Sequence, residues 1–279
     1  MDWALFYFSL GKAGCLLVFY GVSAKQYDVS MHKNILFSFL IVLGLCFAND
    51  QIVAGPPFRT DDPIPVPFQH GELYLFSTAV FDATGANGVG PAVEFNYGIL
   101  PNTQFHLVLP MAFSALKGET SHVGYGDTEV GIKFRFVDQS TYMPAIATFP
   151  FLEIPTGNAS MNLGNGEAQI YLPIWLQKDM GNWTIYGGGG YWIHPGIGNK
   201  NWLFTGLLLQ YNFTNTFFLG AELFHQTSSS IDTKAYSGLH VGGGIPIVKD
   251  YQILFSTDLG NGITSYKHFS YYFGFYHTF

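Results

Sequence analysis

Polar and ionisable side chains recur at every second position within short apolar stretches of this chain. Glu94 and Asn96, for example, alternate with Val93 and Phe95. Successive side chains of a strand point to opposite faces, so this spacing gathers the polar groups on one face. Ten residues share that face: Glu94, Asn96, Gln104, His106, Glu129, Lys133, Arg135, Gln169, Glu222 and Asp258. On an enclosed face they would either pair with one another as a polar plug or line a pore.

These residues form no recognisable catalytic or metal-binding motif. His106 has no serine in its own stretch, so its pattern favours a hydrogen-bonded structural histidine over a nucleophile–base pair. The nine histidines show no H-x-x-x-H spacing, and both cysteines precede residue 49. The glycine runs at 187–190 and 241–244 lack the Lys-Ser/Thr of a phosphate loop and predict bends or room for inward neighbours. We therefore expect no enzyme, no catalytic residue, no metal site and no cofactor.

The composition indicates how such faces are enclosed. Charged residues are 11% of the chain and aromatic residues 18%, whereas soluble domains carry about 25% charged residues. After residue 48 no apolar run is long enough for a spanning helix. This combination favours a membrane β-barrel, in which only alternate residues face lipid. The net charge of −7 argues against nucleic acid as a partner.

Alternating stretches separated by turn residues predict the strands. They lie near residues 72–81, 93–99, 104–111, 129–136, 143–153, 168–178, 183–193, 202–212, 216–225, 235–247, 251–258 and 268–279. Short connections alternate with longer ones at 82–90, 113–124, 154–166, 194–201, 226–234 and 259–267. We predict an all-β fold: a transmembrane antiparallel up-and-down β-barrel of about 12 strands over residues 72–279. The longer connections would face outward, with both chain ends in the periplasm.

The segment that starts at Met31 has the layout of a secretory signal peptide. A basic head at Lys33 precedes an apolar run and the small residue Ala48, after which we expect cleavage, with Ala54 as the second choice. Residues 31–48 are then the signal peptide of an exported outer-membrane protein. Residues 1–30 would be an upstream mis-start or an N-terminal extension.

Residues 49–71 precede the first predicted strand and are rich in proline, which excludes a helix. Arg59, Asp61 and Asp62 form a charged cluster within this stretch. It is either a solvated periplasmic tail or a segment inserted into the lumen, where the cluster would meet the inward charges. We favour the inserted segment.

Aromatic residues mark both faces of the predicted wall. In the final stretch, FSYYFGFYHTF, one phase supplies a lipid-facing girdle, and the terminal Phe279 resembles the signal read by the barrel-assembly machinery. Outer-membrane lipid and that machinery are therefore expected partners. A second aromatic set faces inward, either as stacking surfaces for a solute or as filler: Tyr74, Phe76, Tyr171, Trp175, Tyr186 and Trp192.

Three motifs resemble a known bacterial family. PPFRTDDPIPV followed by HGELYLF, GYGDTEVGIKFRF at 124–136, and FPFLEIPTGN at 149–158 are similar to the "meta-pathway of phenol degradation" family. The resemblance implies an outer-membrane barrel with a transport role, often linked to aromatic or hydrophobic compounds, and it carries over no binding residue.

We therefore predict an outer-membrane channel for passive passage of small molecules, including aromatic or hydrophobic ones. The alternatives are a closed structural or adhesive barrel with partner-binding loops, and a barrel enzyme of the phospholipase type.

Overall fold

The computed structural model describes residues 56–258 and 269–279. The expected signal peptide at 31–48, the stretch before it and the connection at 259–267 lie outside the described residues.

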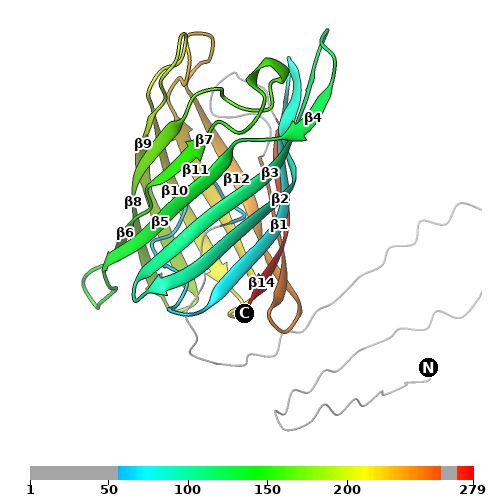
Figure 1. Ribbon diagram of the computed structural model, residues 1–279. Coiled ribbons are helices and arrows are strands. Elements are labelled where there is room, and N and C mark those ends of the chain that lie inside the picture. Colours follow the sequence, from blue (N-terminus) through cyan, green and yellow to red (C-terminus); the bar gives the residue numbers. More distant parts are fainter. Residues whose placement is uncertain (1–55, 259–268) are drawn as a thin grey trace, which may run out of the picture. The chain divides into compact units, whose positions relative to one another are not determined.

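Antiparallel strands make up nearly all of the regular secondary structure in the described residues and close into a barrel (Figure 1). Each strand pairs with its neighbours in the wall, and the first pairs with the last. The strands are β1 (Gly71–Asp82), β2 (Gly85–Leu100), β3 (Thr103–Leu116), β4 (His122–Tyr125), β5 (Thr128–Val137), β6 (Ala145–Thr148), β7 (Phe151–Ile154), β8 (Gln169–Met180), β9 (Trp183–Ile193), β10 (Trp202–Asn212), β11 (Phe218–Gln226), β12 (Tyr236–Val248), β13 (Tyr251–Asp258) and β14 (Phe269–Thr278). A short 3₁₀ turn, η1 (Ala159–Met161), lies in the connection between β7 and β8.

Two wall strands are interrupted, so these segments make the predicted twelve-stranded barrel. β4 and β5 both pair with β3, and β6 and β7 both pair with β5 and β8. Pro150 lies in the gap between β6 and β7, where its missing N–H cannot join the ladder. The predicted all-β barrel is confirmed.

The predicted strand boundaries are wrong at one end of the barrel. β1 and β2 are joined at residues 83–84, and β2 pairs with β1 and β3 from Gly85 onward, so 82–90 is mostly strand and not a long loop. β3 likewise continues to Leu116, inside the predicted loop 113–124. These extensions carry Gly, Asn and Ser without strict alternation. Polar and apolar residues alternate along a strand when one face contacts lipid and the other is enclosed, and this alternation is weak in the two extensions.

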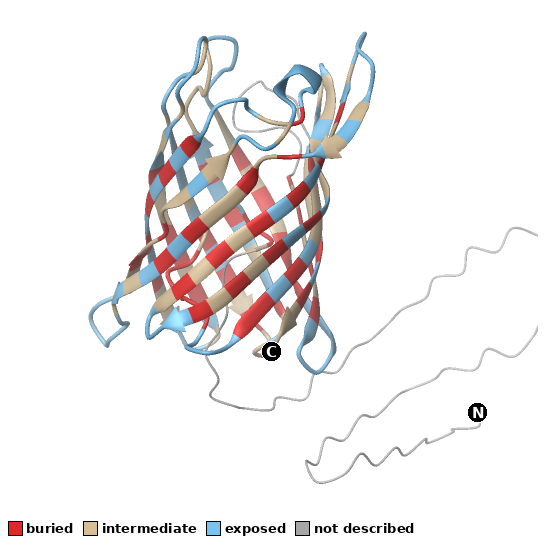
Figure 2. Ribbon diagram, in the orientation of Figure 1, coloured by how far each residue is buried: buried red, intermediate tan, exposed pale blue. Residues whose placement is uncertain are grey.

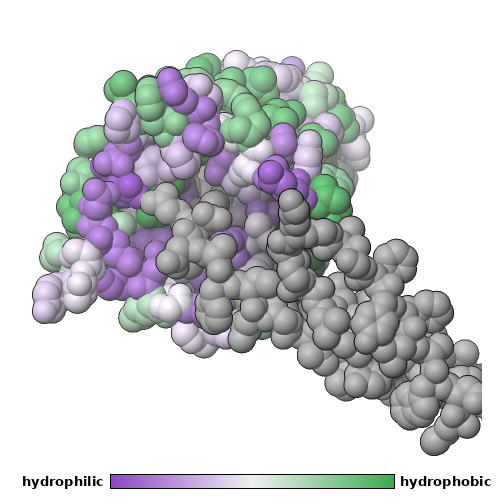
Figure 3. All heavy atoms as spheres, turned by 90° about the horizontal axis from the view of Figure 1, so that it is seen from below, coloured by the Kyte–Doolittle hydropathy of each residue, from purple (hydrophilic) through white to green (hydrophobic). Residues whose placement is uncertain are grey.

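The wall alternates between buried and exposed residues along almost every strand (Figure 2). In β8, Tyr171 and Trp175 are buried, whereas Leu172 and Ile174 are half-exposed on the outer surface. Viewed from below, hydrophobic residues gather along the upper rim and hydrophilic residues lie nearer the middle (Figure 3). This is the two-faced pattern expected of a strand between lipid and an enclosed interior.

The two ends of the barrel differ in their connections. One end, here called the turn end, carries the connections at 101–102, 138–144, 181–182, 213–217 and 249–250, and also the chain's C-terminus. The opposite end, the loop end, carries longer connections such as 155–168, 194–201 and 227–235. Within the described part of the chain, no helix is long and apolar enough to cross a membrane.

Candidate functional site

Residues 56–70 are here called the N-terminal segment. Its residues up to Val66 lie mostly buried inside the barrel and are bonded to the wall at several points, whereas residues 67–70 are exposed. The Oγ of Ser256 donates to the carbonyl of Pro57 at 2.6 Å. The N–H and Oγ1 of Thr60 both donate to Oε1 of Glu222 at 2.6 Å. The N–H of Val66 donates to Oε1 of Gln104 at 2.9 Å. Wall side chains thereby satisfy main-chain groups that proline-rich sequence cannot pair with itself.

Two glycines of the wall allow the close approach of this segment. A Cβ built on Gly206 would lie 1.8 Å from Oγ1 of Thr60, and one on Gly98 would lie 2.0 Å from the carbonyl oxygen of Pro67. Both distances are far below van der Waals contact, so glycine is required at these positions for the segment to lie as it does.

Glu222 is the main anchor of the segment and is fully buried. Its Oε2 also accepts from the N–H of Arg59 at 3.2 Å and lies 3.2 Å from Nδ1 of His240. The other ring nitrogen of His240, Nε2, is 3.8 Å from Asp258 and 3.3 Å from Oγ of Ser270. A buried carboxylate needs such partners to offset its loss of water.

Serine, histidine and glutamate therefore meet in the interior, as they do in hydrolases. Here the acid's two oxygens also hold the N-terminal segment, and the imidazole Nε2 lies between the serine and a second carboxylate, Asp258. The Ser270–His240 distance is longer than a well-formed nucleophile–base hydrogen bond. We assign this cluster to anchoring the segment.

A cavity of about 170 Å³, here called the polar chamber, lies between the segment and β1, β2, β3 and β5. Most of its walls are ionisable or amide side chains: Arg59, Asp61, Asp62, Glu72, Glu94, Asn96, Gln104, His106, Glu129 and Lys133. Nζ of Lys133 lies 3.0 Å from Asp61 and 3.6 Å from Asp62, so one buried cation joins the wall to the segment. Complete burial raises the pKa of the Asp62 carboxyl well above its usual range, while Lys133 acts in the opposite direction.

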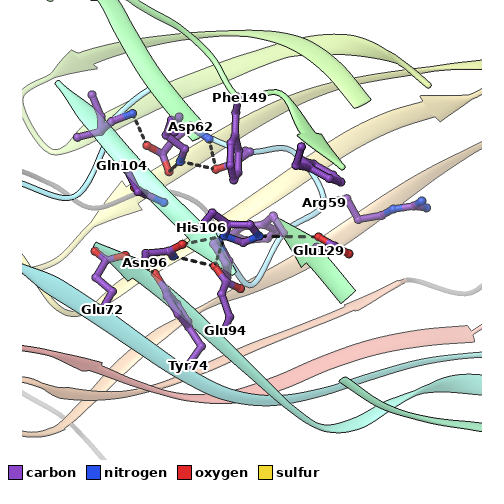
Figure 4. A pocket seen from close by; sticks show the side chains of 16 residues that line it. Arg59, Asp62, Glu72, Tyr74, Glu94, Asn96, Gln104, His106, Glu129 and Phe149 are labelled. Atoms are coloured by element: carbon purple, nitrogen blue, oxygen red, sulfur yellow. Dashed lines mark hydrogen bonds and ion pairs between the residues drawn. The ribbon is translucent and has the colours of Figure 1, made fainter. Parts of the chain in front are cut away.

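His106 lies at the centre of this chamber's hydrogen-bond network (Figure 4). Its Nδ1 is 2.7 Å from Oδ1 of Asn96 and 3.6 Å from Glu94, and its Nε2 is 3.8 Å from Glu129. The Asn96 amide in turn donates to Glu94 at 2.8 Å. This agrees with the sequence-based view of His106 as a hydrogen-bonded residue.

A second cavity, also of about 170 Å³ and here called the aromatic chamber, adjoins the first and lies between the segment and β7, β8, β9 and β10. Its walls are Arg59, Asp61, Phe149, Phe151, Tyr171, Trp175, Trp192, Trp202 and Phe204. The rings of Tyr171, Trp192 and Trp202 form a stack with centroid separations of 4.7 and 5.0 Å. Such stacks are rigid and present ring edges and faces to the free space.

Arg59 extends from the segment along this chamber and is held by uncharged groups. Its guanidinium donates to the hydroxyl of Tyr236 at 2.6 Å and to Oε1 of Gln226 at 2.8 Å. It also lies 4.6 Å from the ring centroid of Phe224 and 5.4 Å from that of Phe204, within the range of cation–π attraction.

The structure separates the sequence-predicted polar residues into groups. Glu94, Asn96, Gln104, His106, Glu129 and Lys133 come together in the polar chamber with the three charged residues of the segment. Glu222 and Asp258 meet at the segment's anchor. Two others lie elsewhere: Gln169 donates to Glu153 at 3.3 Å, and Arg135 pairs with Asp138 at the turn end at 2.9 Å.

The inward aromatic residues also divide. Tyr171, Trp175 and Trp192 line the aromatic chamber, whereas Tyr74 and Tyr186 pack in a separate cluster around Phe58, with Phe76 against its edge. Sequence reasoning missed other residues that lie on the same inward phase and could have been found by it: Phe204, Phe224, Gln226, Tyr236 and His240. In the part of the chain that the structure describes, no cluster of His, Cys, Asp or Glu is arranged to hold a metal ion.

Comparison with known proteins bears on the fold. No protein-family model matches this chain, and no match to a curated protein was found. Among solved structures, it is similar to an outer membrane channel from Pseudomonas putida F1, with a TM-score of 0.63 and 14% identity over 78% of this chain and 98% of that one. At this identity the likeness shows the fold alone: the chain has the fold of an outer-membrane β-barrel.

More distant likenesses are to outer membrane phospholipase A from Escherichia coli and to the translocator domain of autotransporter NalP from Neisseria meningitidis. The first has 14% identity over 79% of this chain and 92% of that one, with a TM-score of 0.42. The second has 12% identity over 75% and 87%, with a TM-score of 0.43. Neither carries a functional argument.

Proposed function

We propose that this protein is an outer-membrane channel for the passive passage of small molecules, including aromatic or hydrophobic ones. The loop end would face outward and the turn end, with the N-terminal segment, the periplasm. Outer-membrane lipid would contact the apolar outer face, and the barrel-assembly machinery would read the terminal Phe279.

The observation that carries the proposal is the free space inside the barrel beside the N-terminal segment. Two cavities of about 170 Å³ each lie along it, and they share walls at Arg59, Asp61, Phe149 and Phe151. One is mostly polar and the other mostly aromatic. A closed structural barrel would be more stable if side chains filled these cavities, because protein interiors normally pack without voids of this size.

Two findings support the finer description of the solute. The stacked rings of the aromatic chamber offer apolar surface next to the polar chamber. The three sequence motifs resemble the meta-pathway of phenol degradation family, whose members are often linked to aromatic or hydrophobic compounds. We accordingly propose membership of that family and an aromatic or hydrophobic solute.

The second candidate function is a closed structural barrel. It is favoured by the several hydrogen bonds that hold the N-terminal segment in the lumen, three of them to Glu222. Such a segment narrows any route through the barrel.

Single-channel recording of the purified protein in planar lipid bilayers separates these functions. Discrete conductance steps are expected for a channel, and a bilayer that stays silent at high protein density would instead support the closed barrel. Release of fatty acid from phospholipid vesicles by the same preparation would contradict both candidate functions and support an enzyme of the phospholipase type.

A further inference from the structure

Arg59 carries a positive charge that the interior leaves without a counter-ion. No carboxylate of residues 56–258 or 269–279 lies within 4.0 Å of its guanidinium, although Lys133, Arg135 and Lys249 all have carboxylate partners. The carboxylate nearest in sequence, Asp61, is paired with Lys133. The buried Lys133 has two carboxylate partners, so of these two cations inside the barrel it is Arg59 whose guanidinium has room for an anion.

The guanidinium is also held in one orientation while remaining accessible. Tyr236 and Gln226 each accept one of its N–H groups, and Phe204 and Phe224 lie against it. Arg59 nonetheless remains an exposed residue, in contrast to its buried neighbours Phe58 and Thr60. A guanidinium has five N–H donors, so donors remain for a ligand, and their planar arrangement suits a carboxylate.

The free space next to Arg59 is the aromatic chamber. Its volume of about 170 Å³ compares with the roughly 150 Å³ of an apolar cavity that binds benzene. Its walls are rings, and Arg59 and Asp61 are their charged members. Asp61 is paired with Lys133, whereas the guanidinium of Arg59 has no carboxylate within 4.0 Å among the described residues.

We propose that the aromatic chamber is a binding site for a small planar aromatic carboxylate, whose carboxylate accepts hydrogen bonds from Arg59 and whose ring lies among Phe151, Trp192 and Phe204. The proposal deepens the proposed channel function, on which it rests for its physiological role. The polar chamber, lined by Glu72, Glu94 and Glu129, would repel the same anion and so keep it on the aromatic side.

Equilibrium binding to the detergent-purified full chain tests the site without requiring conductance. Trp175, Trp192 and Trp202 line the chamber, so tryptophan fluorescence reports its occupancy. The probes are benzoate, benzyl alcohol and benzylamine, which share one ring and differ in the charge of the head group. We expect benzoate to bind about tenfold or more tightly than the other two, because charge-assisted hydrogen bonds are about twice as strong as neutral ones. Equal or tighter binding of benzylamine, or no saturable binding of benzoate, would overturn the proposal.

Variants of Arg59 connect this preference to the residue. Arg59→Gln should abolish the preference for benzoate while leaving the affinity for benzyl alcohol unchanged, which also shows that the chamber is intact. Arg135→Gln removes the same group from the turn end and should leave all three affinities as in the unaltered protein. If Arg59→Gln still binds benzoate more tightly than benzyl alcohol and benzylamine, the proposal is refuted.

Arg59→Lys covers the case in which Arg59→Gln disturbs the segment and loses benzyl alcohol as well. Lysine keeps the charge without the planar donors, so benzoate should still bind more tightly than benzylamine, by a smaller factor. If Arg59→Lys no longer binds benzoate more tightly than benzylamine, the proposal is overturned.

The binding site and the channel function can fail separately. If the protein binds these probes as expected but shows no conductance, the channel function is refuted and the binding site is retained.

Discussion

Arg59 and Asp61 are two residues apart in the N-terminal segment, yet the lumen holds their side chains in opposite ways. Asp61 lies 3.0 Å from a buried lysine, and a second carboxylate, Asp62, shares that cation. Arg59 is held by a hydroxyl, an amide oxygen and aromatic rings. Both residues line both chambers, but Asp61 is paired with a cation of the polar wall, whereas the charge of Arg59 lies among uncharged groups and rings.

This difference indicates that the polar and aromatic chambers have different roles. Paired charges inside a protein fix one arrangement, because breaking a pair leaves an uncompensated ion. A cation held by neutral groups keeps its field available to a ligand. We therefore assign positioning of the segment to the polar side and solute contact to the aromatic side.

Removing the segment should have the largest effect, since it abolishes both sides at once. Deletion of residues 56–68 takes away the groups that bond to Glu222, Gln104 and Lys133. We expect single-channel conductance to rise clearly above that of the full chain, because the lumen loses its obstruction. Arg59→Gln, which keeps the segment and removes only the Arg59 charge, should change conductance less than the deletion does. Unchanged conductance in the deletion variant would show that the segment does not limit passage.

Lys133→Met tests the polar side alone. Its charge is buried, and its loss leaves Asp61 and Asp62 without their cation. We expect the free energy of unfolding to fall by about 3 kcal/mol, the lower end of the cost of breaking a buried ion pair. Urea titration in detergent, followed by the gel shift between folded and unfolded barrel, measures it. If Lys133→Met lowers the free energy of unfolding by less than about 1 kcal/mol, the ion pair contributes no more than an exposed one. Lys133→Arg keeps the charge and should lower the free energy of unfolding less than Lys133→Met does.

Gly98→Ala tests how closely the segment must approach the wall. The new Cβ would lie 2.0 Å from the carbonyl oxygen of Pro67 and 2.7 Å from that of Val66, and main-chain atoms cannot rotate away. Overpacking of this kind costs roughly 1–3 kcal/mol, to be measured by the same urea titration. Gly124→Ala, whose Cβ would meet only a δ-methyl group of Leu163, should have a smaller effect. Equal effects would mean that the segment can shift freely.

Tyr236→Phe should have the smallest effect and tests the aromatic side. The change removes a hydroxyl that accepts from Arg59 at 2.6 Å and donates to Gln226 at 3.2 Å, and it leaves the ring in place. Arg59 is exposed, so water can replace the lost partner, and the free energy of unfolding should fall by only about 0.5–1.5 kcal/mol, as measured by urea titration. A loss as large as that of Lys133→Met would contradict the contrast between the two sides.

Much of the fold could be predicted from the sequence because a strand between lipid and an enclosed interior alternates with period two. That period placed Glu94, His106 and Glu222 on the inward face, and the count of such stretches matched the twelve-stranded wall. It did not mark the strand ends at 82–90, where the alternation fades. It also could not indicate that Pro150 interrupts a wall strand without ending it.

The sequence by itself determined which residues of each strand face inward, and that a charged, proline-rich stretch precedes the barrel. Only the tertiary structure decided which inward residues meet. His240 lies beside Glu222 on the adjacent strand, while Lys133 and Arg59 reach partners more than 70 residues away. The physical reason is that such contacts depend on how the strands are staggered when the barrel closes and on the path of the segment through it. A period of two residues is a local property and contains neither.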